Sequence, residues 1–247
     1  MQAIILAAGR GTRLKAKTDT LPKAMIEIAG KPLLEYSLKA LVENGITDVT
    51  MVVGFRHETI TRRFGTHYRG LKIHYVLNDN YAGSGSMYSL ALVKDIIADE
   101  ILLMESDLLY EPRAISLLLN GGHPNAVLVA GLSGSGDEVY ICANDKQEIT
   151  ELGKNIPVSC KKNAMGELAG ISIFQRKFLE LVFRNAQEDF QNGKMNYHYE
   201  ECVFRTSQQS IPIRAVPGKD LAWIEVDTAA DLQKAQDLIY PLIKDKF

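Results

Sequence analysis

A glycine-bearing loop near the start of the chain carries many cations. The apolar run at residues 3–8 leads into Gly9-Arg10-Gly11-Thr12-Arg13-Leu14, and Leu21-Pro22-Lys23 follows. Glycines leave backbone N–H groups free to wrap an anion, and basic side chains neutralise phosphate oxygens. The charged residues of this stretch are Arg10, Arg13, Lys15, Lys17 and Lys23, against one acid, Asp19. The loop therefore predicts a polyphosphate-binding site.

Two common phosphate-binding motifs do not fit this loop. In a dinucleotide-binding motif a third glycine and a helix follow at once, but Leu14 occupies that glycine position and we expect no helix soon after it. A Walker loop needs Gly-Lys-Ser/Thr, which the sequence lacks. What remains is a strand that ends in a flexible anion-binding loop.

Acidic side chains follow two predicted strands. Asp107 comes directly after the strand at 101–104, and Asp227 follows a strand near the end of the chain. Open α/β folds bind ligands at the carboxyl ends of their strands, and Mg²⁺ prefers carboxylate oxygens. Glu105 and Glu225 are each two residues from these aspartates, so each faces the same side as its aspartate. Both glutamates are expected to bind the metal through water or to orient its ligands. For either aspartate taken alone, the alternative role is that of a helix cap.

These motifs together resemble one enzyme family. Leu-Ala-Ala-Gly-x-Gly-Thr-Arg-Leu, Leu-Pro-Lys, a strand-terminal Ser-Asp and a late Glu-x-Asp-Thr are similar to the nucleotidyltransferases that activate sugar phosphates and phosphoalkylamines with NTP. The resemblance implies that Arg13 and Lys23 act at the reacting phosphates and that Asp107, Asp227 and Glu225 hold Mg²⁺. It implies nucleotide contacts from Leu6, Ala8, Gly9, Gly11, Thr12, Arg13 and Lys23.

A second polar loop, residues 78–90, concerns the base and the acceptor. In the family this loop reads the nucleobase, which implies contacts from Gly83, Ser84, Gly85 and Ser86. Its Asn-Asp-x-Tyr start and Met-Tyr-Ser-Leu end are most similar to the cytidylyltransferases of phosphocholine and 2-aminoethylphosphonate. It lacks the Gln and Gly-Leu/Thr-Ala pattern of the sugar-phosphate branch. The resemblance thus implies CTP and a small amine-bearing phosphonate or phosphate.

The two candidate acceptors, phosphocholine and 2-aminoethylphosphonate, differ in their cationic group. A quaternary ammonium needs an aromatic cage, whereas a primary ammonium donates three hydrogen bonds. The only tryptophan is Trp223, and a small valine lies among the acids of residues 137–140, so we favour a primary amine, 2-aminoethylphosphonate. Tyr197 and Tyr199 could equally be packing residues. The predicted acceptor contacts are Tyr88, Glu105, Tyr140, Tyr197, Tyr199 and Glu200.

Alternating strand and helix patterns predict the fold class. We expect a Rossmann-like, doubly wound α/β fold with a mixed, mostly parallel sheet and a small added β/α region. Strands are predicted at residues 3–8, 49–53, 73–77, 101–104, 127–130, 139–142, 149–152, 168–174, 213–216 and 222–226. Helices are predicted at 33–43, 57–64, 86–97, 177–190, 197–205 and 229–243. We expect one domain, with nucleotide binding in about 1–125, acceptor binding in about 126–220, and the metal strand and closing helix in about 221–247.

Composition excludes several other classes of protein. The 247 residues carry 28 Lys+Arg and 30 Asp+Glu, a formal charge of -2, which gives no global field for nucleic acid or an anionic membrane. The three cysteines, Cys142, Cys160 and Cys202, form no CxxC pair and suggest neither disulfides nor a zinc site. A cytoplasmic protein is therefore expected.

The predicted activity is Mg²⁺-dependent transfer of CMP from CTP to the acceptor, with release of pyrophosphate. Three alternatives stay open: a phosphocholine cytidylyltransferase, a sugar-1-phosphate nucleotidyltransferase, and a non-catalytic nucleotide-sensing module. The presence of both aspartates beside Lys23 argues against the last of these.

Overall fold

The computed structural model describes residues 1–17 and 20–247, except for the side chains of residues 15–17. Its strands are β1 (Gln2–Ala7), β2 (Glu27–Ile28), β3 (Lys31–Pro32), β4 (Asp48–Val53), β5 (His67–Tyr68), β6 (Leu71–Leu77), β7 (Glu100–Glu105), β8 (Leu108–Tyr110), β9 (Ala126–Ala130), β10 (Tyr140–Ala143), β11 (Ile149–Gly153), β12 (Gly166–Gln175), β13 (Arg214–Gly218) and β14 (Trp223–Glu225). Its α-helices are α1 (Leu33–Glu43), α2 (His57–Phe64), α3 (Ser86–Ala91), α4 (Arg113–Asn120), α5 (Val158–Lys162), α6 (Arg176–Gln191), α7 (Tyr199–Gln209), α8 (Ala229–Lys234) and α9 (Tyr240–Ile243). Short 3₁₀ segments are η1 (Thr12–Lys17), η2 (Lys23–Met25) and η4 (Lys244–Lys246), and η3 (Ala235–Ile239) is a π-helical segment.

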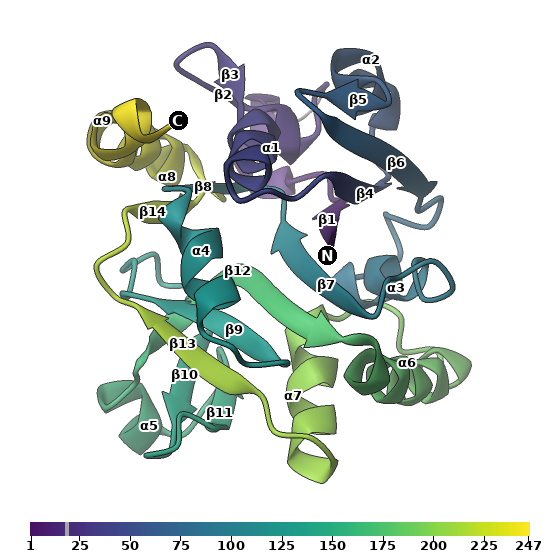
Figure 1. Cartoon of the computed structure of the whole chain (residues 1–247), viewed down its shortest axis with the longest axis vertical. Helices are drawn as coiled ribbons and strands as arrows, with labels where there is room; N and C mark the ends of the chain where they lie inside the picture. Colours follow the sequence, from purple (N-terminus) through teal and green to yellow (C-terminus); the bar gives the residue numbers. More distant parts are fainter. Residues whose placement is uncertain (18–19) are drawn as a thin grey trace.

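The sheet has a parallel centre with an antiparallel extension. Strands β7, β1, β4 and β6 lie side by side in this order and run parallel. The second half of the chain joins the same sheet through β12, which pairs antiparallel with β7 and with β9. In Figure 1, β12 runs beside β7 across the middle of the molecule. The predicted α/β fold with a mixed sheet is confirmed.

Alternation along the first strand explains the two helical layers. Ala3 and Ile5 pack into one core with the apolar stripes of α1, α2 and α4, whereas Ile4 and Leu6 pack into a second core with α3, α6 and α7. Successive side chains of a strand point to opposite faces, so a continuous apolar run fits a strand that is covered on both sides. This strand carries the glycine loop at its carboxyl end.

Several element boundaries differ from the predicted ones. The helix predicted at 86–97 ends at Ala91 and continues as turns, and the helix predicted at 197–205 begins at Tyr199, where His198 is its cap. The closing helix is interrupted by the π segment η3. A short 3₁₀ helix, η1, follows the glycine loop, where no early helix was expected, because Leu14 is buried and its N–H bonds to Gly11.

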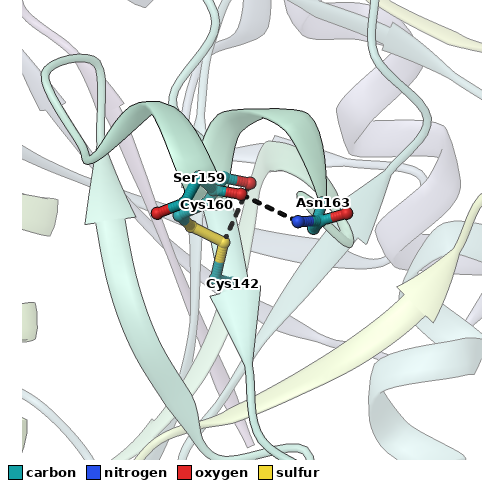
Figure 2. Close-up of a disulfide and its surroundings, with 4 residues drawn as sticks. All are labelled: Cys142, Ser159, Cys160 and Asn163. Atoms are coloured by element: carbon teal, nitrogen blue, oxygen red, sulfur yellow. Dashed lines mark hydrogen bonds between the residues drawn. A yellow bond between two sulfur atoms is a disulfide. The ribbon is translucent and has the colours of Figure 1, made fainter.

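The structure also contains a disulfide, contrary to the expectation from the cysteine spacing. Cys142 on β10 is bonded to Cys160 on α5, with a Cα–Cα separation of 6.2 Å (Figure 2). The prediction was wrong because β10, the hairpin to β11 and α5 fold back on one another, which sequence spacing does not reveal. Cys202 is free and buried. Because disulfides are rare in reducing compartments, cysteine usage no longer supports a cytoplasmic location.

Reducing this disulfide is expected to lower the free energy of unfolding by about 3 kcal/mol, because the bond closes a loop whose ends are 18 residues apart. Urea unfolding with and without reductant measures the loss. The double variant Cys142→Ser, Cys160→Ser should match the reduced protein and ignore reductant. A wild-type unfolding midpoint that does not move on reduction would contradict a structural role for the bond.

No helix in the described part of the chain is both long and apolar enough to cross a membrane.

Candidate active site

Lys23 is held rigidly beside the glycine loop. Pro22 begins the 3₁₀ turn η2, in which the Met25 N–H bonds to the Pro22 carbonyl at 2.9 Å, and the buried Ala24 and Met25 anchor that turn in the core. Gly11 has φ +70°, and a Cβ there would lie 2.8 Å from the Cβ of Lys23. A glycine at position 11 therefore serves two needs, the left-handed backbone and the close passage of Lys23.

The ammonium of Lys23 lies among three carboxylates. Its Nζ is 2.6 Å from Asp107 Oδ2 and 3.6 Å from Glu225 Oε1, and it also forms a close ion pair with Asp227. The Lys23 side chain is only 10% exposed. The structure thus brings together the lysine and the acids that the sequence places far apart along the chain.

A small two-stranded sheet brings Asp107 and Asp227 together. Strand β8, just after Asp107, pairs antiparallel with β14, just before Asp227. The Val226 N–H also bonds to the Asp107 carbonyl at 3.0 Å. The buried Leu109 and Ile224 pack this pair of strands against the C-terminal helices, which fixes the late acidic segment beside the end of β7.

Electrostatics in this cluster are strongly coupled. Burial alone would lower the pKa of Lys23, but the fields of Asp107, Glu225 and Asp227 outweigh it and raise that pKa. Burial, followed by repulsion from Asp107, raises the pKa of Glu225 to about 8. Burial also raises the pKa of Glu105, with repulsion from Glu225 and Asp107 adding to the rise. The two glutamates therefore bind protons more readily than free carboxyls do unless a further cation enters the cluster.

The donor set fits a hard divalent cation. Oxygen atoms of Glu105, Asp107 and Glu225 all lie within 4.8 Å of one another. Asp107 Oδ1 is buried and receives no hydrogen bond from the described residues. Carboxylate oxygens are ligands of Mg²⁺, and an orphaned carboxylate oxygen is costly unless a cation or donor reaches it. Asp227, the second predicted ligand, is paired here with Lys23 and Arg13.

A cavity of about 630 Å³ opens over this cluster. It is large enough for a nucleotide-sized ligand. The predicted nucleotide-contact residues that line it are Leu6, Ala8, Gly9, Gly11, Thr12, Arg13, Lys23, Ser84, Gly85 and Ser86. Gly83 does not line it and packs against the Asn80 side chain instead. The predicted cations Lys15 and Lys17 and the acid Asp19 lie outside the described residues and side chains.

The larger cavity also contains residues that sequence reasoning missed. Asn196 and His198 come from the segment before α7 and line the same cavity as the glycine loop. Backbone bonds bring this segment there, since the Gly85 N–H bonds to the Met195 carbonyl at 2.9 Å. A Cβ on Gly85 would collide with the backbone of Tyr197. No local sequence pattern marks such a contact.

A smaller cavity of about 290 Å³ adjoins the same cluster, because Arg13, Glu225 and Asp227 line both cavities. In the wall shared by the two cavities, the guanidinium of Arg13 forms ion pairs with Asp227 at 2.8 Å and with Asp137 at 2.5 Å. Asp137 is also paired with Lys154 at 2.7 Å. Arg13 therefore joins a carboxylate of the Lys23 cluster to a carboxylate from the second half of the chain.

The predicted acceptor contacts are scattered. Glu105 lines the larger cavity, but Tyr88, Tyr140, Tyr197, Tyr199 and Glu200 line neither cavity. The Tyr197 hydroxyl donates to Asp189 at 2.8 Å, and the Tyr88 ring packs edge-on against Phe190. Tyr199 is buried, and Glu200 is buried with its Oε2 unpaired among the described residues. Their role in acceptor binding stays a prediction.

Residues 3–152 match the model of the MobA-like NTP transferase domain. This range contains the glycine loop, Lys23 and Asp107. The chain belongs to the MobA-like NTP transferase family and is an NTP-dependent nucleotidyltransferase.

Two relatives and one solved structure are similar to nearly the whole of this chain. A CMP-5'-(3-aminopropyl)phosphonate synthase of Streptomyces rubellomurinus is 26% identical over 239 residues, which cover 95% of this chain and 38% of that protein. The chain thus spans less than half of that relative's length. A choline-phosphate cytidylyltransferase of Streptococcus pneumoniae is 24% identical over 242 residues, 97% of this chain and 98% of that protein. The solved structure of an inositol-1-phosphate CTP transferase from T. maritima shares the fold, with a TM-score of 0.79 and 21% identity over 99% of this chain and 95% of that one.

Proposed function

We propose that this protein is a Mg²⁺-dependent cytidylyltransferase. It joins CMP from CTP to a small amine-bearing phosphonate or phosphate, with 2-aminoethylphosphonate as the best candidate. The observation that carries the proposal is the placement of Lys23 among Asp107, Glu225 and Asp227 at the floor of the larger cavity. Nucleotidyl transfer develops negative charge on phosphate oxygens, so it needs both fixed cations and carboxylates that hold a metal.

The reaction is one in-line displacement. An oxygen of the acceptor phosphonate or phosphate forms a bond to the α-phosphorus, and the bond from that phosphorus to the oxygen bridging the α- and β-phosphates breaks. Pyrophosphate leaves with the electron pair. A phosphomonoester already carries most of its negative charge at neutral pH, so no general base is required. Catalysis then consists mainly of positioning and charge stabilisation.

The chain's own residues divide this work. Backbone N–H groups of the glycine loop and the guanidinium of Arg13 hold the triphosphate, for which Arg13 leaves its carboxylate partners. Lys23 neutralises charge at the reacting phosphate. Asp107 and Asp227, with Glu225, would hold Mg²⁺, which supplies Lewis-acid polarisation when bound.

The choice of CTP and of an amine acceptor rests on three supports. The loop of residues 78–90 has the cytidylyltransferase pattern, and the two relatives above are named for CMP or cytidylyl transfer to an aminophosphonate and a choline phosphate. The second half of the chain builds the smaller cavity beside the reacting groups. In this proposal residues 1–125 bind the nucleotide, 126–220 the acceptor, and 221–247 provide the late metal carboxylates.

A pyrophosphate-release assay tests the proposal. It offers CTP, UTP, ATP and GTP in turn with 2-aminoethylphosphonate, phosphoethanolamine, phosphocholine, inositol 1-phosphate and glucose 1-phosphate. We expect release with CTP and an amine-bearing acceptor. The kcat/KM with CTP should be at least about tenfold above that with UTP, which is the discrimination that one well-placed polar contact provides. Release confined to glucose 1-phosphate, or to an NTP other than CTP, would refute the proposal.

A further inference from the structure

The smaller cavity lies on the acceptor side of the reacting centre. Arg13 and Asp227 line it at the end it shares with the larger cavity, and Glu138 and Glu167 line it from the second half of the sheet. Val139, Leu168 and Trp223 contribute apolar wall. The cavity therefore offers a cation where it meets the larger cavity, carboxylates from the second half of the sheet, and apolar surface.

Glu167 is buried with half of its hydrogen-bonding capacity unused. The residue is 3% exposed, and its Oε1 accepts a hydrogen bond from the Ser133 N–H at 2.8 Å. The Ser133 side chain also acts on this carboxylate, and no hydrogen bond from any other described residue reaches Oε2. A carboxylate oxygen in this situation is left for a donor that enters the cavity.

Glu138 lies near Glu167 and is also buried, at 9% exposure. It accepts hydrogen bonds from the Gly136 N–H at 3.2 Å and the Tyr140 hydroxyl at 3.1 Å. Burial raises the pKa of Glu167, hydrogen bonds from Ser133 act against the rise, and the Glu138 carboxylate adds to it. Burial acts to raise the pKa of Glu138 as well, but hydrogen bonds from the backbone and Tyr140 outweigh it and lower that pKa. A cation between the two carboxylates would relieve the repulsion that Glu138 exerts on Glu167.

The other charged groups of this cavity are already engaged. Asp137 is paired with Arg13 and Lys154, and Asp231 exchanges hydrogen bonds with Thr228, the N-cap residue of α8. Glu225 and Asp227 belong to the Lys23 cluster. Lys234, which also lines the cavity, is the exception, and within the described part of the chain no ion pair joins it to either glutamate. A cationic group of the ligand can therefore occupy this place.

We propose that the smaller cavity binds the acceptor with its primary ammonium between Glu138 and Glu167 and its phosphonate or phosphate toward Arg13 and Asp227. This subsite rests on the proposed function for the identity of the acceptor. It places the amine between Glu167, which the sequence did not single out, and Glu138, one of the acids of residues 137–140, in place of the predicted Tyr197 and Tyr199.

A primary ammonium fits these walls better than a quaternary one. Its three N–H groups can donate to carboxylate oxygens, whereas a trimethylammonium donates none and is bound by several aromatic rings. Among the described residues that line the cavity, Trp223 alone has an aromatic ring. The aliphatic stem of the acceptor would lie along Val139 and Leu168.

The subsite is tested by the binding of two matched probes, 2-aminoethylphosphonate and ethylphosphonate, which lacks the amine. Calorimetric titrations use the full chain with Mg²⁺ and without nucleotide, for wild type, Glu167→Gln, Glu138→Gln and the control Glu188→Gln, an exposed glutamate on α6. We expect wild type and the control to bind 2-aminoethylphosphonate at least about tenfold more tightly than ethylphosphonate, as charge-assisted hydrogen bonds allow. Both cavity variants should lose this preference while keeping the wild-type unfolding temperature.

Two results overturn the subsite: a wild type with no preference for the amine, or cavity variants that keep the preference. The steady-state KM for the amine acceptor, measured with CTP, separates this from the proposed function. If the wild type turns over the amine acceptor and the cavity variants have an unchanged KM for it, the subsite is refuted and the proposed function is not. Glutamate-dependent binding of the amine without any CMP-linked product refutes the proposed transfer and leaves the subsite standing.

Discussion

Replacing Asp107 by asparagine is expected to reduce kcat by at least about 10³-fold, and Asp227→Asn should do the same. Each change removes a carboxylate from the site proposed for Mg²⁺, and loss of Lewis-acid stabilisation is worth several kcal/mol at the transition state. Asp107 is the more informative of the two, since its Oδ1 is buried with no partner among the described residues.

The fold of these variants should survive. Burial is the main cause of the raised pKa values of Glu225 and Glu105, and repulsion from Asp107 adds to both, so neutralising Asp107 relieves that repulsion. Lys23 keeps Asp227 as a partner in Asp107→Asn. Circular dichroism and thermal unfolding check this, with Asp145→Asn, in an exposed turn, as the matched control. Full activity in either site variant would remove the metal assignment.

Lys23→Met is expected to reduce kcat by about 10²-fold or more, the loss typical of one group that stabilises charge in a transition state. The same change should strengthen the binding of Mn²⁺ to the nucleotide-free protein by at least about tenfold, because an ammonium 2.6 Å from Asp107 no longer competes for the carboxylates. The two effects have opposite signs, which a general loss of folding could not produce.

Steady-state kinetics and Mn²⁺ titration by electron paramagnetic resonance measure these effects. Lys177→Met, an exposed lysine on α6, is the control of equal charge change. A Lys23→Met enzyme with normal kcat and a raised KM would mean that the lysine binds only the ground state. Unchanged Mn²⁺ affinity would mean that the lysine does not compete with a cation.

Local patterns in the sequence were enough to predict the mixed α/β sheet, and the roles of the side chains at its edge stay predictions. The apolar run before Gly9 marks a strand covered on both faces, and Asp107 lies at a strand end where parallel sheets bind ligands. The missed elements are short. Helix α4 has an apolar stripe of Ala114, Ile115 and Leu118, yet its eight residues give a weak periodic signal.

Contacts between segments that lie far apart along the chain could not be predicted from the sequence. Asn196 and His198 reach the larger cavity because backbone bonds join their segment to Gly85. Glu138 and Glu167 become a pair because the irregular segment before β10 and the strand β12 face one cavity. The disulfide likewise depends on how α5 returns to β10. In each case the deciding fact is a distance between segments that carry no shared motif.

The central claim is that the chain transfers a cytidylyl group onto an acceptor oxygen. Phosphorus NMR of a mixture of protein, CTP, Mg²⁺ and 2-aminoethylphosphonate tests it most directly. We expect two new, mutually coupled resonances from a phosphonate–phosphate anhydride, in equal amount to pyrophosphate. A spectrum in which CTP stays intact, or is hydrolysed to CMP without a linked product, would contradict it.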